Sequence, residues 1–188
     1  MAKTPAPSKS AAPPKSVAAP KSTTVPARES EDLSALVKKH IKKGASANLL
    51  TWVILGGKNF MPKQPVSDFD FLTASDKGIT KQSLINLADI MDIPMKDIAI
   101  LLNVSYKTLG RKQNTDILDS LVSSLSIEIA NTIANGLSVF EEADKLNRWL
   151  QKENRSMNGK KPIELLSTPT GIKMVNRVLN RIEEGIYT

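Results

Sequence analysis

The stretch from Lys77 to Lys112 decides the fold, and it reads KGITKQSLINLADIMDIPMKDIAILLNVSYKTLGRK. Its apolar residues recur every three or four positions, and this spacing predicts helices rather than strands. A first helix is followed by a second that begins near Pro94. Asn103-Val104 predicts a tight turn, because Asn tolerates the left-handed backbone conformation that such turns often need. Ser105 can cap a third helix, which runs from Tyr106 to about Lys112.

The last two of these helices have the spacing of a DNA-binding helix-turn-helix. Ala99 is small enough for two helices to cross, and Val104 and Leu109 are predicted to point into the core. Short hydroxyl and basic side chains remain exposed, and they suit base edges and phosphates in a major groove. Helix pairs of this geometry also occur in helical bundles without binding DNA, so the spacing leaves both roles open. The candidate DNA-binding residues are Ser105, Tyr106, Lys107, Thr108, Arg111 and Lys112.

Helical spacing continues downstream of this region. A longer helix is predicted to end near Gly136, because glycine is a common helix stop. Ser138 and Glu141 have the spacing of a capping box, so another helix is expected to start there. The apolar side of the longer helix consists of Leu118, Leu121, Leu125, Ile129 and Ile133.

The last helix has a well-marked start. Pro162 opens a short helix that reaches Leu166, after which Thr168 is a helix cap and Pro169 takes the first helical position. Gly185 is predicted to end this last helix.

Upstream, Leu33, Val37 and Ile41 recur at helical spacing. Leu49–Leu55 is a short buried element that is either a helix or a strand. No alternating strand pattern of useful length occurs elsewhere. The predicted fold class is therefore mainly α, with a helix-turn-helix domain followed by a small helical C-terminal domain.

Residues 1–30 are rich in Pro, Ala, Ser and Lys and contain no aromatic residue. Such a segment buries too little apolar surface to offset the entropy of ordering, so a disordered tail is predicted. The tail has five basic residues and one acidic residue, which contribute +4 of the chain's formal net charge of +7. The remainder is only modestly basic, and the tail is either a solvated extension or a contact to DNA phosphates.

The composition excludes several classes of protein. The absence of cysteine excludes disulfides, zinc–thiolate sites and thiol nucleophiles. His40 is the one histidine, and the chain has neither a Gly-rich phosphate loop nor a supported acid–base pair. We therefore expect no catalytic residues, no metal and no cofactor. No apolar run approaches the roughly 20 residues that span a bilayer, so a cytoplasmic protein without a membrane partner is expected.

The stretch from Ser138 to Thr188 reads SVFEEADKLNRWLQKENRSMNGKKPIELLSTPTGIKMVNRVLNRIEEGIYT. It resembles the toxin-binding domain of the Xre/MbcA/ParS antitoxin family, from type II toxin–antitoxin systems with RES-domain toxins. Lys77–Lys112 is similar to the family's Xre-like helical region, whereas Asn114–Ile117 departs from its Ser-Pro-containing, Arg-rich link. The matching residues are Phe140, Trp149-Leu150, Asn154, Gly159, Pro162, Leu165-Leu166, Thr168, Gly171, Val175, Leu179, Ile182-Glu183, Gly185 and Tyr187.

The resemblance implies a function and three partners. The family's toxins degrade NAD⁺, and the antitoxin covers the toxin's active site with its C-terminal end at or near the pocket. Family members dimerise through the Xre-like part, and many bind their own operator. The implied partners are thus a RES-domain toxin, operator DNA and a second copy of the chain. The candidate toxin-binding residues are Asn154, Arg155, Glu183, Gly185, Ile186, Tyr187 and Thr188.

The chemistry of the C-terminal tip is compatible with this role. Gly185 frees Ile186, Tyr187 and Thr188 from the helix, so an apolar residue, an aromatic ring and a carboxylate lie at the tip. A pocket that binds an anionic dinucleotide can accept a carboxylate, and a tyrosine ring can stack there. Simple fraying of the last residues is the alternative.

Four parts are predicted along the chain: a tail at 1–30, an N-terminal helical extension and linker at 31–66, an Xre-like helix-turn-helix and dimerisation domain at 67–136, and a toxin-binding domain at 137–188. The alternative function is a stand-alone helix-turn-helix transcriptional regulator without a toxin partner. A RES-domain gene beside this one would favour the antitoxin.

Overall fold

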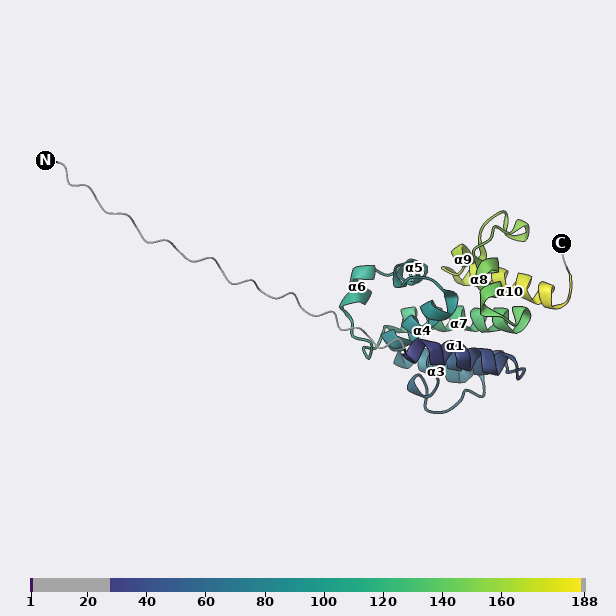
Figure 1. Cartoon of the computed structure of the whole chain (residues 1–188), viewed down its shortest axis with the longest axis horizontal. Helices are drawn as coiled ribbons and strands as arrows, with labels where there is room; N and C mark the ends of the chain where they lie inside the picture. The colour runs from purple at the N-terminus through teal and green to yellow at the C-terminus, as the bar shows by residue number, and fades with distance from the viewer. Residues whose placement is uncertain (2–27, 187–188) are drawn as a thin grey trace.

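The longest helix, α7 (Ser120–Phe140), runs through the middle of the fold (Figure 1). The computed structural model describes Met1 and residues 28–186, and every named element in these ranges is helical. The other elements are α1 (Arg28–Ile41), α2 (Ala47–Ile54), the 3-10 helix η1 (Gly57–Asn59), α3 (Asp68–Lys77), α4 (Lys81–Met91), α5 (Met95–Leu101), α6 (Tyr106–Arg111), α8 (Ala143–Leu150), the 3-10 helix η2 (Arg155–Met157), α9 (Pro162–Leu165) and α10 (Pro169–Glu183).

The predicted disordered tail at residues 1–30 lies outside the described residues, apart from Met1 and residues 28–30. Residues 28–30 form the first turn of α1, so the tail was predicted to extend too far. The last proline of the tail is Pro26, and no helix-breaking residue stands between it and the rest of α1.

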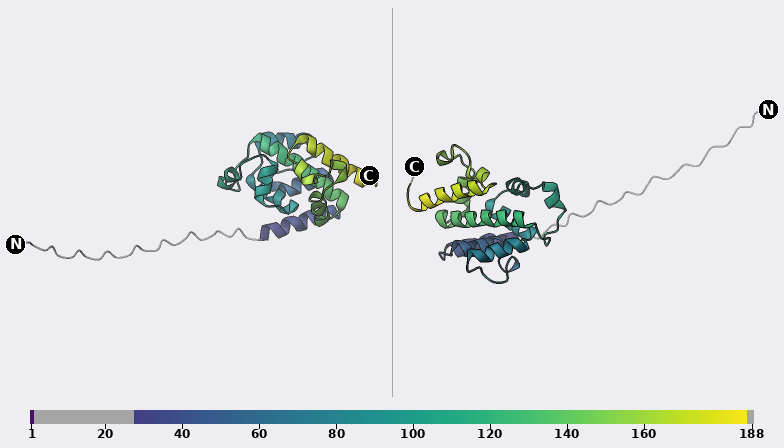
Figure 2. Two further views of the ribbon diagram at one scale, coloured as in Figure 1. Left: turned by 90° about the horizontal axis from the view of Figure 1, so that it is seen from above. Right: turned by 180° about the vertical axis from the view of Figure 1, so that it is seen from behind.

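Helices from both halves of the chain pack against α7. α2 and α3 lie on one side of it and α10 on another (Figures 1 and 2). Ile129, Ile133 and Leu137 of α7 are completely buried in the core between these helices. Because α7 packs against α2 and α3 as well as α10, it holds the C-terminal helices against the rest of the fold.

The element whose type the sequence left open is helical. Leu49–Leu55 lies in and directly after α2, which Ser46 begins by accepting a hydrogen bond from the Leu49 N–H. Leu50 and Ile54 are fully buried, and α2 packs along α7. The region between residues 33 and 55 is therefore part of the core.

Local capping explains where several helices start. Asp119 accepts from the Val122 N–H at 3.0 Å and begins α7, and Thr168 accepts from the Gly171 N–H at 3.1 Å and begins α10. Asp70 accepts from the N–H groups of Val66 and Ser67 at the start of α3. These backbone hydrogen bonds hold the pKa of Asp70 below its ordinary value.

The predicted stop at Gly136 is wrong, because α7 continues to Phe140. The backbone at Gly136 is helical, and a Cβ there would lie 2.5 Å from the side chain of Leu146 on α8. This glycine therefore serves close helix packing rather than termination. The capping box at Ser138 and Glu141 is also wrong: the Ser138 hydroxyl donates to the Ala134 carbonyl, and Glu141 ends α7 with a φ of +59°.

One residue of the predicted apolar side is outside the core. Leu121 is 82% exposed and Leu125 is half-buried, whereas Ile129 and Ile133 are buried as expected. Leu121 lies on the solvent side of the first turns of α7, whose other side is buried through Val122 and Ser123. The predicted apolar side is therefore partly exposed at the start of this helix.

Candidate functional site

The predicted helix-turn-helix corresponds to α5 and α6. Asn103 takes the left-handed conformation with a φ of +53°, as expected for the turn. Val104 N–H donates to the Ala99 carbonyl at 2.9 Å, which closes the end of α5. Ala99 and Leu109 are buried, and Val104 is half-buried. The predicted turn and the inward-facing positions are confirmed.

The candidate DNA-binding residues lie together on and beside α6. Ser105 stands at the N-cap, although its side chain forms no capping hydrogen bond. Leu109 is the one buried residue of α6. The exposed candidates on this face are Ser105, Tyr106, Lys107, Thr108 and Arg111.

Lys112 differs from the other candidates because its ammonium group is already engaged. It is half-buried, and its Nζ donates to the carbonyl of Ile117 at 3.0 Å. Lys81 at the start of α4 donates from Nζ to the Lys112 carbonyl at 2.7 Å. Lys112 therefore stabilises the link between α6 and α7 through its hydrogen bond to Ile117, in addition to any contact with a partner.

The link after α6 is held against the start of α4. The Lys81 N–H donates to the Asp116 carbonyl, and the Gln82 N–H donates to the Asn114 carbonyl. An isolated antiparallel bridge joins Thr80 and Ile117. Sequence spacing could not identify Lys81 as a positioning residue, because its partners are about thirty positions away along the chain.

A polar network joins α10 to α7. The Asn135 side-chain amide donates to the side-chain oxygens of Asn176 and Asn180 at 3.1 and 3.2 Å. The Asn176 amide donates to the Thr132 hydroxyl at 2.9 Å. Side-chain amides that satisfy one another at a helix–helix contact fix the register of the two helices. The position of the C-terminal end of α10 is thereby set by α7.

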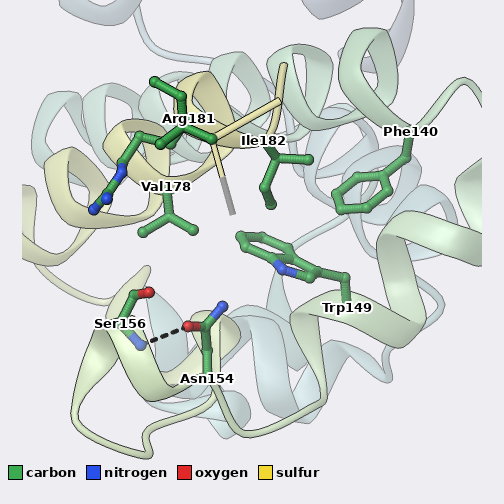
Figure 3. A pocket seen from close by; sticks show the side chains of 8 residues that line it. Phe140, Trp149, Asn154, Ser156, Val178, Arg181 and Ile182 are labelled. Carbon is green, nitrogen blue, oxygen red and sulfur yellow. Dashed lines mark hydrogen bonds between the residues drawn. The ribbon is translucent and has the colours of Figure 1, made fainter. Parts of the chain in front are cut away.

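Next to the C-terminal end, α10 and the chain from Phe140 to Ser156 enclose an open pocket of about 300 Å³ (Figure 3). The rings of Phe140 and Trp149 lie 5.6 Å apart at one side of it. Asn154 accepts from the Ser156 N–H at 2.9 Å on the opposite wall from α10. The lining residues are Phe140, Trp149, Asn154, Ser156, Val178, Arg181, Ile182 and Ile186.

The structure brings together two of the candidate toxin-binding residues, Asn154 and Ile186, at this pocket. Arg155, Glu183 and Gly185 are exposed and do not line it. Tyr187 and Thr188 lie outside the described residues.

Gly185 ends the helical conformation as predicted. Its φ is +72°, and the Ile186 N–H donates to the Arg181 carbonyl at 2.8 Å. This turn directs the end of the described chain back over the last turn of α10.

Sequence reasoning missed Val178 and Arg181 as site residues. With Ile182 they have the spacing i, i+3, i+4 that places side chains on one face of a helix, so the signal was present. What the spacing could not supply was the opposite wall, formed by residues more than twenty positions away.

The two candidate surfaces lie at opposite ends of the helical part of the chain. α6 is at one end of this part and the C-terminal end of α10 is at the other (Figures 1 and 2). One chain therefore has room for two partners at once. None of the helices within residues 28–186 is both long enough and apolar enough to cross a membrane. In the same range, no three His, Cys, Asp or Glu side chains form a metal-binding cluster.

Comparisons with known proteins identify the C-terminal domain and the family of the chain. Residues 136–185 match the family model of the antitoxin Xre/MbcA/ParS C-terminal toxin-binding domain. Over 123 residues the chain is 30% identical to Antitoxin Xre of Pseudomonas putida, and the match covers 63% of this chain and 74% of that protein. A helical protein with such a domain is an antitoxin, which binds a toxin through its C-terminal domain and is not an enzyme. The chain belongs to the Xre/MbcA/ParS antitoxin family.

Proposed function

We propose that this antitoxin neutralises a RES-domain, NAD⁺-degrading toxin by covering the toxin's active site with its C-terminal end. The observation that carries the proposal is the end of α10: Gly185 breaks the helix with a φ of +72°, and Ile186 follows it beside the pocket of the matched toxin-binding domain. Because α10 is firmly packed on α7, only the short segment after it has to become ordered when it enters a neighbouring pocket. The entropy cost of binding is therefore small. The proposed toxin-binding residues are those at this end, together with Asn154 and Arg155.

Co-expression with the adjacent gene tests this proposal. The toxin alone should stop growth and deplete cellular NAD⁺, and the full chain should restore both and co-purify with the toxin. Loss of NAD⁺ without protection would contradict the proposed neutralisation. The absence of any RES-domain gene beside it would favour the alternative of a stand-alone transcriptional regulator.

We also propose a division of the chain at about residues 66 and 136, with an Xre-like domain at 67–136 and a toxin-binding domain at 137–188. The second boundary lies inside α7, so this helix would be shared by both domains. A shared helix would transmit a displacement of one domain to the other. The N-terminal part at 31–66 would then support the Xre-like domain through the packing of α2 on α7.

Binding of operator DNA by α6 is the second part of the proposal. It is supported by the exposed hydroxyl and basic groups on that helix, where Lys107 and Arg111 are the exposed cations of α6. Replacing both residues by Ala should weaken binding to the upstream region and lower the salt dependence of binding by about two units, one for each lost phosphate contact. A gel-shift titration at several salt concentrations measures both quantities.

The matched control for this prediction is the pair Lys173→Ala and Arg177→Ala on α10, which removes the same charge far from α6. That variant should bind DNA like the unchanged protein. If the unchanged protein shifts no DNA, or if both double variants lose binding equally, α6 has only a structural role.

A homodimer is the third part of the proposal, and the exposed apolar start of α7 supports it. Ile117 and Leu121 are 59% and 82% exposed, and they are four residues apart. Leu121→Asp should convert the dimer into a monomer in sedimentation experiments, because a buried charge without a partner opposes association. Val66→Asp is the control, since Val66 is a similarly exposed apolar residue in a loop. A dimer that survives Leu121→Asp would exclude this surface.

A further inference from the structure

The pocket beside the C-terminal end is not filled by the side chains that surround it. Val178 and Ile182 of α10 point into it from above, and the Trp149 ring lies below Ile182 (Figure 3). These side chains are only half-buried. They leave an open pocket of about 300 Å³ at the surface, with a mainly apolar lining. This volume is at the small end of the range for ligand sites.

One basic side chain of α10, Arg181, lines the pocket. Lys173 and Arg177 precede it along the same helix and do not line the pocket. Among the side chains of residues 33–186, the one ion pair joins Lys145 and Glu142, so Arg181 has no carboxylate partner within that range. The nearest acidic residues along the chain, Glu183 and Glu184, are exposed and do not line the pocket.

Seven of the eight lining residues lie in the segment that matches the toxin-binding domain, and Ile186 directly follows it. The pocket is therefore part of the matched toxin-binding domain. It is also next to the C-terminal end that is proposed to cover the toxin's active site. A partner seated there would reach the pocket and that end at the same time.

We propose that the pocket receives an aromatic or branched apolar side chain of the toxin, next to a toxin carboxylate that pairs with Arg181. The inference rests on the proposed function, because it deepens the description of the same toxin-binding surface. Large side chains that enter apolar pockets supply most of the binding energy in many interfaces. A charged pair at the edge of such a pocket adds specificity and speeds association.

The test measures inhibition of the purified RES-domain toxin by full-length antitoxin variants, with Kd from titration calorimetry and folding from thermal unfolding. Val178→Trp fills the pocket and should raise Kd about thirtyfold, the effect of losing one strong anchor. Arg181→Glu should raise Kd about tenfold and remove part of the salt dependence of association. Lys173→Glu is the control, with the same charge change two turns away, and should alter Kd less than about threefold.

The outcomes separate this inference from the proposed function. If the unchanged antitoxin does not bind the toxin, the proposed function fails. If it binds, and folded Val178→Trp and Arg181→Glu bind equally well, only the pocket inference is overturned. If the variants change their oligomeric state and keep their affinity for the toxin, the pocket binds a second copy of the chain. If Val178→Trp binds the toxin more tightly, the pocket holds the C-terminal end of the antitoxin itself. Either result would overturn the inference.

Discussion

Deletion of Ile186–Thr188 is expected to abolish protection against the toxin while the helical fold is retained. α10 ends at Glu183, and the turn at Gly185 precedes the deleted residues, so the packed helix is left intact. Ile186 is 48% exposed and contributes little to the core. Because these residues are proposed to cover the toxin's active site, inhibition of the toxin should weaken by about two orders of magnitude. Growth on co-expression and NAD⁺ hydrolysis by the purified toxin measure the loss.

The control for this deletion is the double variant Lys160→Ala and Lys161→Ala, which changes exposed residues of the same domain. It should protect as well as the unchanged chain. Circular dichroism should show the same helical content for the deletion variant. Full protection by the deletion variant would show that the toxin is neutralised without the C-terminal end.

Features that depend on neighbouring residues were predictable from the sequence. The turn at Asn103, the start of α10 at Thr168 and Pro169, and its end at Gly185 each follow from a few adjacent residues. In such cases one hydrogen bond or one backbone angle settles the outcome. The helical class of the described residues follows in the same way from regular apolar spacing.

Features that depend on residues far away along the chain were not predictable. Gly136 predicts a helix stop from its residue type, but α8 packs against it and α7 continues. The spacing predicts Leu121 in the core, but Leu121 lies on the exposed side of α7, while its neighbours Val122 and Ser123 are buried. A single sequence shows that a residue is small or apolar, and it does not show which helix lies opposite.

The candidate site shows the same division. Asn154 belongs to the family motif and Ile186 to the predicted C-terminal tip, and both lie at the pocket. Val178 and Arg181 were missed, because the pocket exists only when the η2 segment folds against α10. Lys112 was assigned to DNA from its type, yet its ammonium group donates to the Ile117 carbonyl. Chemical type indicates what a side chain can bind, and the tertiary contacts decide what it does bind.

Gly171→Ala is expected to destabilise the protein strongly, although alanine normally favours a helix over glycine. Gly171 is buried in the first turn of α10, and a Cβ there would overlap the carbonyl of Leu165 in α9. The obstacle is backbone rather than the flexible end of a side chain, so α9 and α10 would have to separate. Overpacking of this kind costs about 3 kcal/mol in the free energy of unfolding. Chemical denaturation measures the loss, and toxin binding should fall with it because both helices belong to the toxin-binding domain.

Gly110→Ala is the matched control for this prediction, since Gly110 is also helical and a Cβ there would meet no atom within 4 Å. The free energy of unfolding of that variant should rise by about 0.5–1 kcal/mol, because alanine has a better helix propensity than glycine. If the free energy of unfolding falls for Gly171→Ala and rises for Gly110→Ala, the close approach of α9, rather than backbone freedom, requires glycine at position 171. Equal gains at both positions would contradict the close contact, and α9 would then not restrict the start of the helix that presents the toxin-binding end.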